Sequence, residues 1–284
     1  MNFRKTLNDF SELVMFQHSV FSLPFIFIAM VVAAEGWFGW KLLFLGLIAA
    51  VSARNFAMGV NRYLDRDIDA LNPRTAGRPS VDGRVSTAQM MGFIVVNALV
   101  FIVTAYWINT LAFGLSIPIL VVLGAYTFFK RFSAAAHLIL GVSLGLAPIA
   151  GVVAVDNAVT LWSIWLALGV MFWVAGFDLL YSLQDMDFDK AQGLHSIPSR
   201  FGAAKTMRIA QVFHVAAVVL WWAFASAAGL GIFGYLAVIF SAGMLAYEHY
   251  LVNKDFTKID RAFFTVNGYL GFVFFGLIVL DVAG

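Results

Sequence analysis

Asn-Arg-Tyr-Leu-Asp-Arg-Asp-Ile-Asp, residues 61–69, closes a long apolar run and places three acids within nine residues. In a helix, Asn61, Asp65 and Asp69 are spaced four apart and share one face, whereas Asp67 points elsewhere. Like charges at this spacing repel each other, so an aligned row of acids at a membrane boundary needs a positive partner. A divalent cation is the simplest partner, because carboxylate and amide oxygens are hard ligands that suit Mg²⁺.

A second stretch, residues 178–189, repeats this arrangement at the end of another apolar run. Asp178, Asp185 and Asp189 share a helical face by their spacing, and Asp187 falls off that face. Each stretch is followed by a basic loop that contains Gly and Pro. Two acid rows that each end an apolar helix suggest one site built from two halves.

The composition indicates an integral membrane protein made of helices. Of the 284 residues, 62% are hydrophobic and 12% are charged, whereas soluble domains contain about 25% charged residues. Apolar runs of about 20 residues recur along the chain, which is the length that spans a bilayer as a helix. The absence of cysteine excludes disulfides, thiolate metal sites and cysteine nucleophiles. We therefore predict an all-α, multi-pass membrane protein with a single domain over residues 1–284, whose first apolar run is retained and is not a cleaved signal peptide.

We predict about nine transmembrane helices that form one bundle around a central cavity. Their approximate bounds are residues 13–34, 41–63, 87–107, 110–129, 135–155, 161–183, 205–228, 231–251 and 262–282. Most of the 18 lysines and arginines fall on one side of this arrangement, and Lys41 alone falls on the other. The positive-inside rule makes the rich side cytoplasmic. The N-terminus and both acid rows then lie on the cytoplasmic side.

Both acid rows together resemble the motifs of the UbiA superfamily of intramembrane prenyltransferases. The family pattern is Asn-Asp-x-x-Asp-x-x-x-Asp on the second helix and Asp-x-x-x-Asp on the sixth. Asn61, Asp65 and Asp69 match the first motif, and Asp185 and Asp189 match the second. The resemblance covers essentially the whole chain. It implies transfer of a polyprenyl group from an allylic polyprenyl diphosphate to an aromatic acid, with Mg²⁺ as cofactor.

Two positions depart from the family pattern, and two others extend the likeness. Asp178 and Tyr181 match an upstream extension that is seen in members of quinone pathways. Arg62 stands where many members have the second Asp of the first motif, and His195 stands where relatives often have Lys. Because Arg62 removes a carboxylate and adds a cation, the sequence leaves the number of metal ions open. It also leaves open whether His195 contacts a diphosphate.

The predicted site combines acids that bind metal with basic groups that bind a diphosphate. The expected metal ligands are Asn61, Asp65, Asp69, Asp178, Asp185 and Asp189, and the acids expected to be catalytic are Asp65, Asp69, Asp185 and Asp189. The expected diphosphate-binding residues are Arg78, Lys130, Arg131 and Tyr126, which precedes Lys130 by one helical turn. For Arg78 and Arg131, an ordinary role as positive-inside residues explains the sequence equally well.

Arg54 lies inside an apolar run, where an arginine is costly unless it faces a partner or a wet cavity. It precedes Asn61 by seven residues and Asp65 by eleven, so it shares their helical face. At the rise of an α-helix, it lies roughly 10 Å deeper in the membrane than Asn61. A guanidinium there can bind the carboxylate of an aromatic acid through two parallel hydrogen bonds. The family resemblance implies the same role. The alternative is a structural pairing with a helix carbonyl or with Asp178.

Two loops, about residues 70–86 and 190–204, are predicted to cap the site and to keep water away from a carbocation. The first contains Gly and Pro at several positions, so we expect it to be mobile without substrate and ordered with it. His137, His214 and His249 lie singly in or near apolar runs, and we predict structural roles for them.

The leading functional hypothesis is an aromatic polyprenyltransferase of ubiquinone or menaquinone biosynthesis, with 4-hydroxybenzoate or a dihydroxynaphthoate as acceptor. The motifs resemble those of a bacterial quinone-pathway branch, which implies a location in the bacterial inner (plasma) membrane. Haem O synthase is the alternative within the superfamily, because its first motif also reads Arg-Asp-Ile-Asp followed by Pro-Arg-Thr. A transporter would place ionisable groups near the bilayer midplane, whereas these acids gather at one surface. The predicted partners are both substrates and the lipid bilayer, with no nucleic acid. The acceptor, the prenyl chain length and the oligomeric state stay open.

Overall fold

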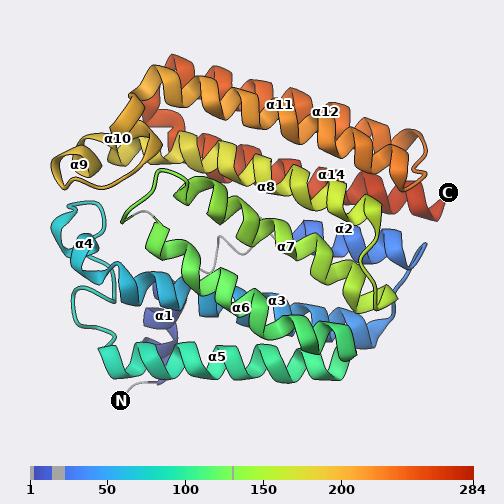
Figure 1. Ribbon diagram of the computed structural model, residues 1–284, viewed down its shortest axis with the longest axis horizontal. Coiled ribbons are helices and arrows are strands. Elements are labelled where there is room, and N and C mark those ends of the chain that lie inside the picture. Colours follow the sequence, from blue (N-terminus) through green and yellow to red (C-terminus); the bar gives the residue numbers. More distant parts are fainter. Residues whose placement is uncertain (1–2, 15–22, 130) are drawn as a thin grey trace. The chain divides into compact units, whose positions relative to one another are not determined.

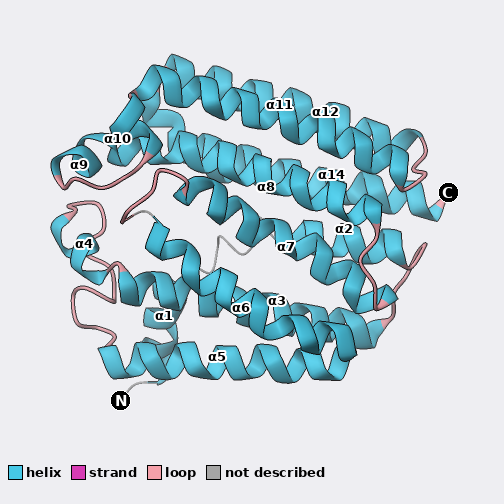
Figure 2. Ribbon diagram, in the orientation of Figure 1, coloured by secondary structure: helices cyan, strands magenta, loops and turns pink. Residues whose placement is uncertain are grey.

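The computed structural model describes residues 3–14, 23–129 and 131–284, and the described chain is helical with connecting loops and without strands (Figures 1 and 2). Eight of its helical segments are long and apolar enough to cross a membrane. They are α3 (Trp40–Leu64), α5 (Thr87–Ile108), α6 (Thr110–Phe129), α7 (Ala136–Asp156), α8 (Leu161–Tyr181) with its continuation to Ala191, α11 (Ala203–Ala227), α12 (Ile232–Lys254), and the segment Phe256–Ala283 that ends in α14 (Asn267–Ala283).

The predicted all-helical membrane fold is confirmed, and these eight segments follow eight of the predicted spans closely. The remaining span, predicted over residues 13–34, lies partly outside the described residues. Its described part contains α2 (Leu23–Ala33), an apolar helix of 11 residues. A separate helix, α1 (Phe3–Leu13), precedes it. Nine spans is therefore an approximate count.

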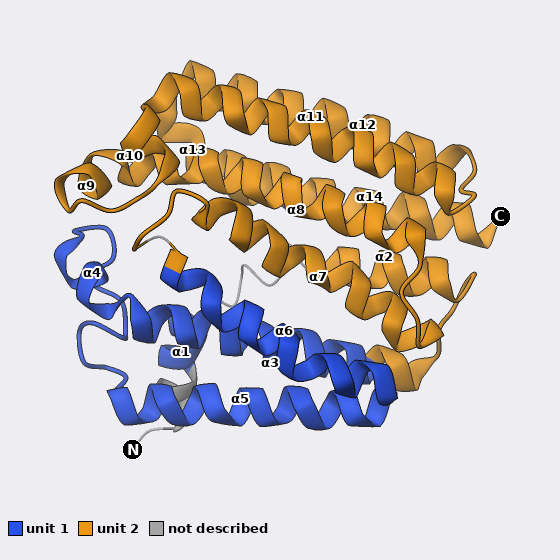
Figure 3. Ribbon diagram, viewed as in Figure 1, with its two compact units in different colours: residues 1–19, 44–128 blue, residues 20–43, 129–284 orange. Residues whose placement is uncertain are grey.

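The chain forms two compact units (Figure 3). Unit 1 comprises residues 1–19 and 44–128, and unit 2 comprises residues 20–43 and 129–284. The first acid row belongs to unit 1 and the second belongs to unit 2. The predicted central cavity and the single domain over the whole chain stay predictions.

In unit 1, α1 is held against the beginning of α5. Phe10 stacks on Phe93 with ring centroids 4.9 Å apart, and Leu13 is buried with Val85 and Met90. Arg84 adds two hydrogen bonds of 2.6 and 2.8 Å to the carboxylate of Glu12, which lower the pKa of that carboxyl below its usual range. These contacts fix α1 beside the loop that follows the first acid row.

In unit 2, an aromatic cluster joins four helices around α8. Phe25 of α2 lies 5.0 Å from Trp173 and 5.6 Å from Trp221, and Trp221 lies 5.3 Å from Phe274 of α14, between ring centroids. A Cβ at Gly169 would overlap the indole of Trp221, so α8 and α11 approach closely because this position has no side chain. These contacts fix the helix that carries Asp178.

A buried polar contact also ties α8 to α12 and α14. Trp173 Nε1 donates to Asn267 Oδ1 at 2.7 Å, and Asn267 Nδ2 donates to Glu248 Oε1 at 2.8 Å. All three side chains are buried. Hydrogen bonds between membrane helices satisfy groups that lipid cannot, and here they set the relative positions of three helices of unit 2.

Candidate active site

The first acid row lies at the junction of α3 and α4 (Arg66–Leu71). The amide of Asp65 donates to the carbonyl of Asn61 at 2.9 Å, and the amide of Asp69 donates to that of Asp65 at 2.8 Å. The four-residue helical spacing therefore continues through the junction. Asp65 and Asp69 are 1% and 5% exposed, whereas Asp67 is exposed to solvent. This agrees with the predicted shared face and with the separate direction of Asp67.

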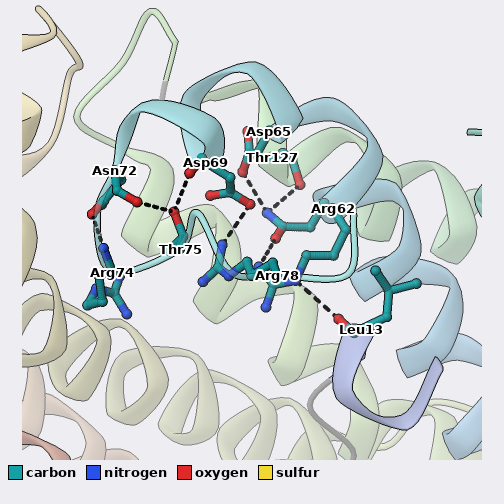
Figure 4. A network of polar contacts seen from close by, with 10 residues as sticks. Leu13, Arg62, Asp65, Asp69, Asn72, Arg74, Thr75, Arg78 and Thr127 are labelled. Atoms are coloured by element: carbon teal, nitrogen blue, oxygen red, sulfur yellow. Dashed lines mark hydrogen bonds and ion pairs between the residues drawn. The ribbon is translucent and has the colours of Figure 1, made fainter. Parts of the chain in front are cut away.

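A chain of hydrogen bonds runs from the end of α1 to Asp65. Arg62 Nε donates to the carbonyl of Leu13 at 3.1 Å, and Arg62 Nη1 donates to Asn61 Oδ1 at 3.2 Å. Asn61 Nδ2 then donates to Asp65 Oδ2 at 2.9 Å and to Thr127 Oγ1 of α6 at 3.3 Å. Figure 4 shows Arg62 between Leu13 and the acid row.

Asp69 is held by the loop that follows it (Figure 4). Arg78 Nη1 lies 2.7 Å from Asp69 Oδ2 in an ion pair, and Thr75 Oγ1 donates to the carbonyl of Asp69 at 2.9 Å. The amide of Arg74 donates to Asn72 Oδ1 at 2.9 Å, which closes a tight turn. Arg78, predicted to bind a diphosphate, thus already contacts a predicted metal ligand.

The other residues predicted to bind substrate do not contact the first acid row through any hydrogen bond given above. Arg54 Nη2 donates at 3.3 Å to the carbonyl of Val14, the residue that follows the last residue of α1. A guanidinium has five N–H donors, so the predicted acceptor role stays a prediction. Tyr126 lies near the end of α6 in unit 1, and Arg131 is exposed near the start of the segment 129–284 of unit 2. Lys130 lies outside the described residues.

The second acid row continues α8 through a 3₁₀ turn (Ser182–Asp185) into α9 (Met186–Ala191). Asp185 and Asp189 are partly buried and Asp187 is exposed, which repeats the pattern of the first row. Tyr181 packs on Phe263 with ring centroids 4.3 Å apart. The acids of this row therefore lie on a helical extension whose base is packed into unit 2.

Asp178 contacts a histidine that the sequence analysis treated as structural. His137 Nδ1 of α7 lies 2.7 Å from Asp178 Oδ2, and the histidine is buried. His137 thus orients a predicted metal ligand. A single histidine in an apolar run does not indicate which residue it contacts, so the sequence did not predict the contact with Asp178. His214 and His249 contact each other instead, with Nδ1 and Nε2 2.9 Å apart.

The segment predicted as the second cap, residues 190–204, contains a short helix. The Ser196 side chain accepts from the amide of Ser199 and begins α10 (Ile197–Phe201), and α11 starts at Ala203. His195 is exposed and immediately precedes Ser196. The segment is therefore more structured than a plain loop.

The donor types fit Mg²⁺, because each row presents carboxylate oxygens. Within residues 3–14, 23–129 and 131–284, however, no three His, Asp or Glu side chains gather closely enough to hold a metal ion. Each row taken alone offers few oxygens, and the two rows belong to different units. Metal binding by these residues stays a prediction.

Residues 22–277 match the model of the UbiA prenyltransferase family. The chain belongs to this family. The family model covers most of both units. A 4-hydroxybenzoate octaprenyltransferase of Paracidovorax citrulli is 32% identical over 90% of this chain and 86% of the relative. Another, of Herminiimonas arsenicoxydans, is 29% identical over 89% of each chain.

A solved structure gives the same assignment, and a second one shows the same fold. A UbiA homologue from Aeropyrum pernix K1 has a TM-score of 0.84 and 31% identity, and covers 93% of this chain and 98% of its own. A UbiA homologue from Archaeoglobus fulgidus bound to GPP and Mg²⁺ has a TM-score of 0.79 at 18% identity, covering 97% and 100%, which is a likeness of fold alone. The family resemblance and the enzyme class predicted from the acid rows are confirmed: this protein is a prenyltransferase.

Proposed function

We propose that this UbiA prenyltransferase transfers a polyprenyl group from an allylic polyprenyl diphosphate to 4-hydroxybenzoate or a related aromatic acid in quinone biosynthesis. The observation that carries the proposal is the match, over most of both chains, to proteins named 4-hydroxybenzoate octaprenyltransferase. The presence of both acid rows and of the partly buried Arg54 on α3 is consistent with it.

The reaction breaks the allylic C–O bond, and the bonding electron pair leaves with the diphosphate. The ring carbon ortho to the phenol hydroxyl bonds to the allylic carbon, and the ring then loses its proton. Asp65, Asp69, Asp178, Asp185 and Asp189 would hold Mg²⁺, an ion that is bound in the homologue from Archaeoglobus fulgidus. When bound, the ion would supply positive charge that offsets the charge developing on the leaving diphosphate.

The chain's own residues bind, orient and shield the substrates. Arg78, Tyr126, Lys130 and Arg131 bind diphosphate oxygens in this proposal, and Arg54 binds the carboxylate of the acceptor. The two cap segments exclude water, which would otherwise quench a cationic prenyl group. We also propose that the site faces the cytoplasm of a bacterium, with the N-terminus on the same side.

The experiment is an assay of purified protein with geranyl diphosphate and 4-hydroxybenzoate. We expect prenylated product with Mg²⁺, no product after chelation by EDTA, and recovery when Mg²⁺ is added back. Asp65→Ala and Asp185→Ala should each abolish turnover while the protein stays folded in detergent. Asp67→Ala and Asp187→Ala are matched controls, because these exposed acids lie off the two rows.

Full activity in Asp65→Ala and Asp185→Ala would show that the acids are only solvated helix ends. Turnover that does not depend on a metal ion would contradict the metal-assisted mechanism. Prenylation of haem in place of the aromatic acid would establish the alternative within the superfamily.

A further inference from the structure

The side-chain amide of Asn61 lies between a cation and a carboxylate. Its oxygen accepts from Arg62 Nη1 at 3.2 Å, and its nitrogen donates to Asp65 Oδ2 at 2.9 Å and to Thr127 Oγ1 at 3.3 Å. All three partners are buried. Asn61 is therefore surrounded by groups that use both ends of its amide.

The chemistry of these neighbours fixes which end points where. A guanidinium can only donate hydrogen bonds, and an ionised carboxylate can only accept them. The reversed amide would direct N–H groups at Arg62 and an oxygen at the Asp65 carboxylate, and both contacts would be repulsive. The orientation of Asn61 thus follows from its neighbours and needs no separate assignment of oxygen and nitrogen.

Arg62 is itself held in place from the other side. It is 4% exposed, and its Nε donates to the carbonyl of Leu13, the last residue of α1, at 3.1 Å. Carbonyl groups at a helix C-terminus carry partial negative charge and favour a cation. The end of α1 therefore anchors the guanidinium that orients Asn61.

We propose that Arg62 is a positioning residue that holds Asn61 as a hydrogen-bond donor to Asp65. In this arrangement Asp65 and Asp69 supply the metal-binding oxygens of the first row, and Asn61 does not. This replaces the expectation that Asn61 is a ligand, and it rests on the proposed metal-dependent function. A metal ion on Asn61 Oδ1 would lie beside the guanidinium, where like charges repel strongly away from bulk water. Asn61 instead orients a ligand, as partners outside the metal's own contacts commonly do.

The test measures Mn²⁺ binding by electron paramagnetic resonance, with inorganic pyrophosphate present and without turnover. Arg62→Lys keeps the charge, but a single ammonium cannot reproduce the fork that reaches both Leu13 and Asn61. We expect Arg62→Lys and Asn61→Leu each to weaken Mn²⁺ binding about 10- to 100-fold. The double variant should bind about as weakly as either single one, because both changes break the same chain of contacts. Arg66→Lys is the matched control, since Arg66 is exposed and donates to Thr87.

Wild-type Mn²⁺ affinity in Arg62→Lys, or effects of the two changes that simply add, would overturn the inference. Crystals of the unmodified protein with Mn²⁺ and pyrophosphate give a second test that needs no variant, should Arg62→Lys fail to fold. Anomalous density about 2.1 Å from Asn61 Oδ1 would make Asn61 a ligand and overturn the inference alone. If the unmodified protein bound no Mn²⁺, both the proposed metal dependence and the inference about Arg62 and Asn61 would be overturned.

Discussion

Arg54 contacts a backbone carbonyl and is predicted to bind the acceptor as well. Its Nη2 donates to the carbonyl of Val14 at 3.3 Å, and the proposed function gives it the carboxylate of the acceptor as well. If that role holds, Arg54→Ala should raise the KM of the acceptor and leave the KM of the diphosphate nearly unchanged. A lost charge-assisted, two-point contact costs on the order of 2–4 kcal/mol, or roughly 30- to 1000-fold in kcat/KM.

The conservative variant and a second acceptor sharpen this prediction. Arg54→Lys should recover only part of the activity, because an ammonium lacks the planar fork of the guanidinium. An acceptor without the carboxylate should be nearly indifferent to either change. Equal weakening of both substrates, or loss of the folded protein, would make Arg54 a structural partner of the end of α1.

At the scale of single residues, helical spacing predicted which acids share a face. It could not predict which residues from other helices contact them. Spacing alone separated Asp67 from Asp65 and Asp69, because residues four apart share a face. It could not show that Arg62 contacts Leu13 or that His137 contacts Asp178, because each pair is distant in sequence. Such contacts depend on how whole helices pack, and one chain's local pattern does not contain that information.

The loop between α4 and α5 is built from successive hydrogen-bonded turns. The amide of Ala76 donates to Asn72, that of Val81 to Arg78, and that of Val85 to Pro79, over 2.8–3.0 Å. Its Thr75 is 2% exposed, and the hydroxyl donates to the carbonyl of Asp69. These contacts differ from the mobile loop expected from the Gly and Pro content, because turns formed by such residues can bond to one another.

We therefore expect amide protection in this loop before any substrate is added. Hydrogen exchange should be slow at the amides of Ala76, Val81 and Val85 in the substrate-free protein. Thr75→Val should speed this exchange and cost about 1 kcal/mol of local stability, because it removes a buried hydrogen bond. Thr87→Val is the control, since its hydroxyl contact is exposed. Fast exchange throughout the loop until a diphosphate analogue is bound would instead support the mobile lid.

At the scale of the whole molecule, hydropathy predicted the spans well but not which helix is most buried. The sequence of α7 is more apolar than that of the α8 segment, yet a larger share of the residues in the α8 segment is buried. Lipid tails are as apolar as a protein core, so both environments select similar residues. Burial depends instead on positions such as Gly169, where the lack of a side chain lets Trp221 approach. The role of such a position is visible only when the packed helices are known.

The proposed orientation in the membrane can be tested with single cysteines, because the chain contains none of its own. Gln192→Cys reports on the arginine- and lysine-rich side, and Ala158→Cys reports on the opposite side; both positions are exposed in loops. In intact bacterial spheroplasts, a membrane-impermeant maleimide should label Ala158→Cys and should label Gln192→Cys only after permeabilisation. The physical basis is the retention of Lys and Arg in cytoplasmic loops. Each variant should first be shown to retain turnover. Labelling of Gln192→Cys from outside would contradict the proposed orientation and would place the second acid row on the outer face.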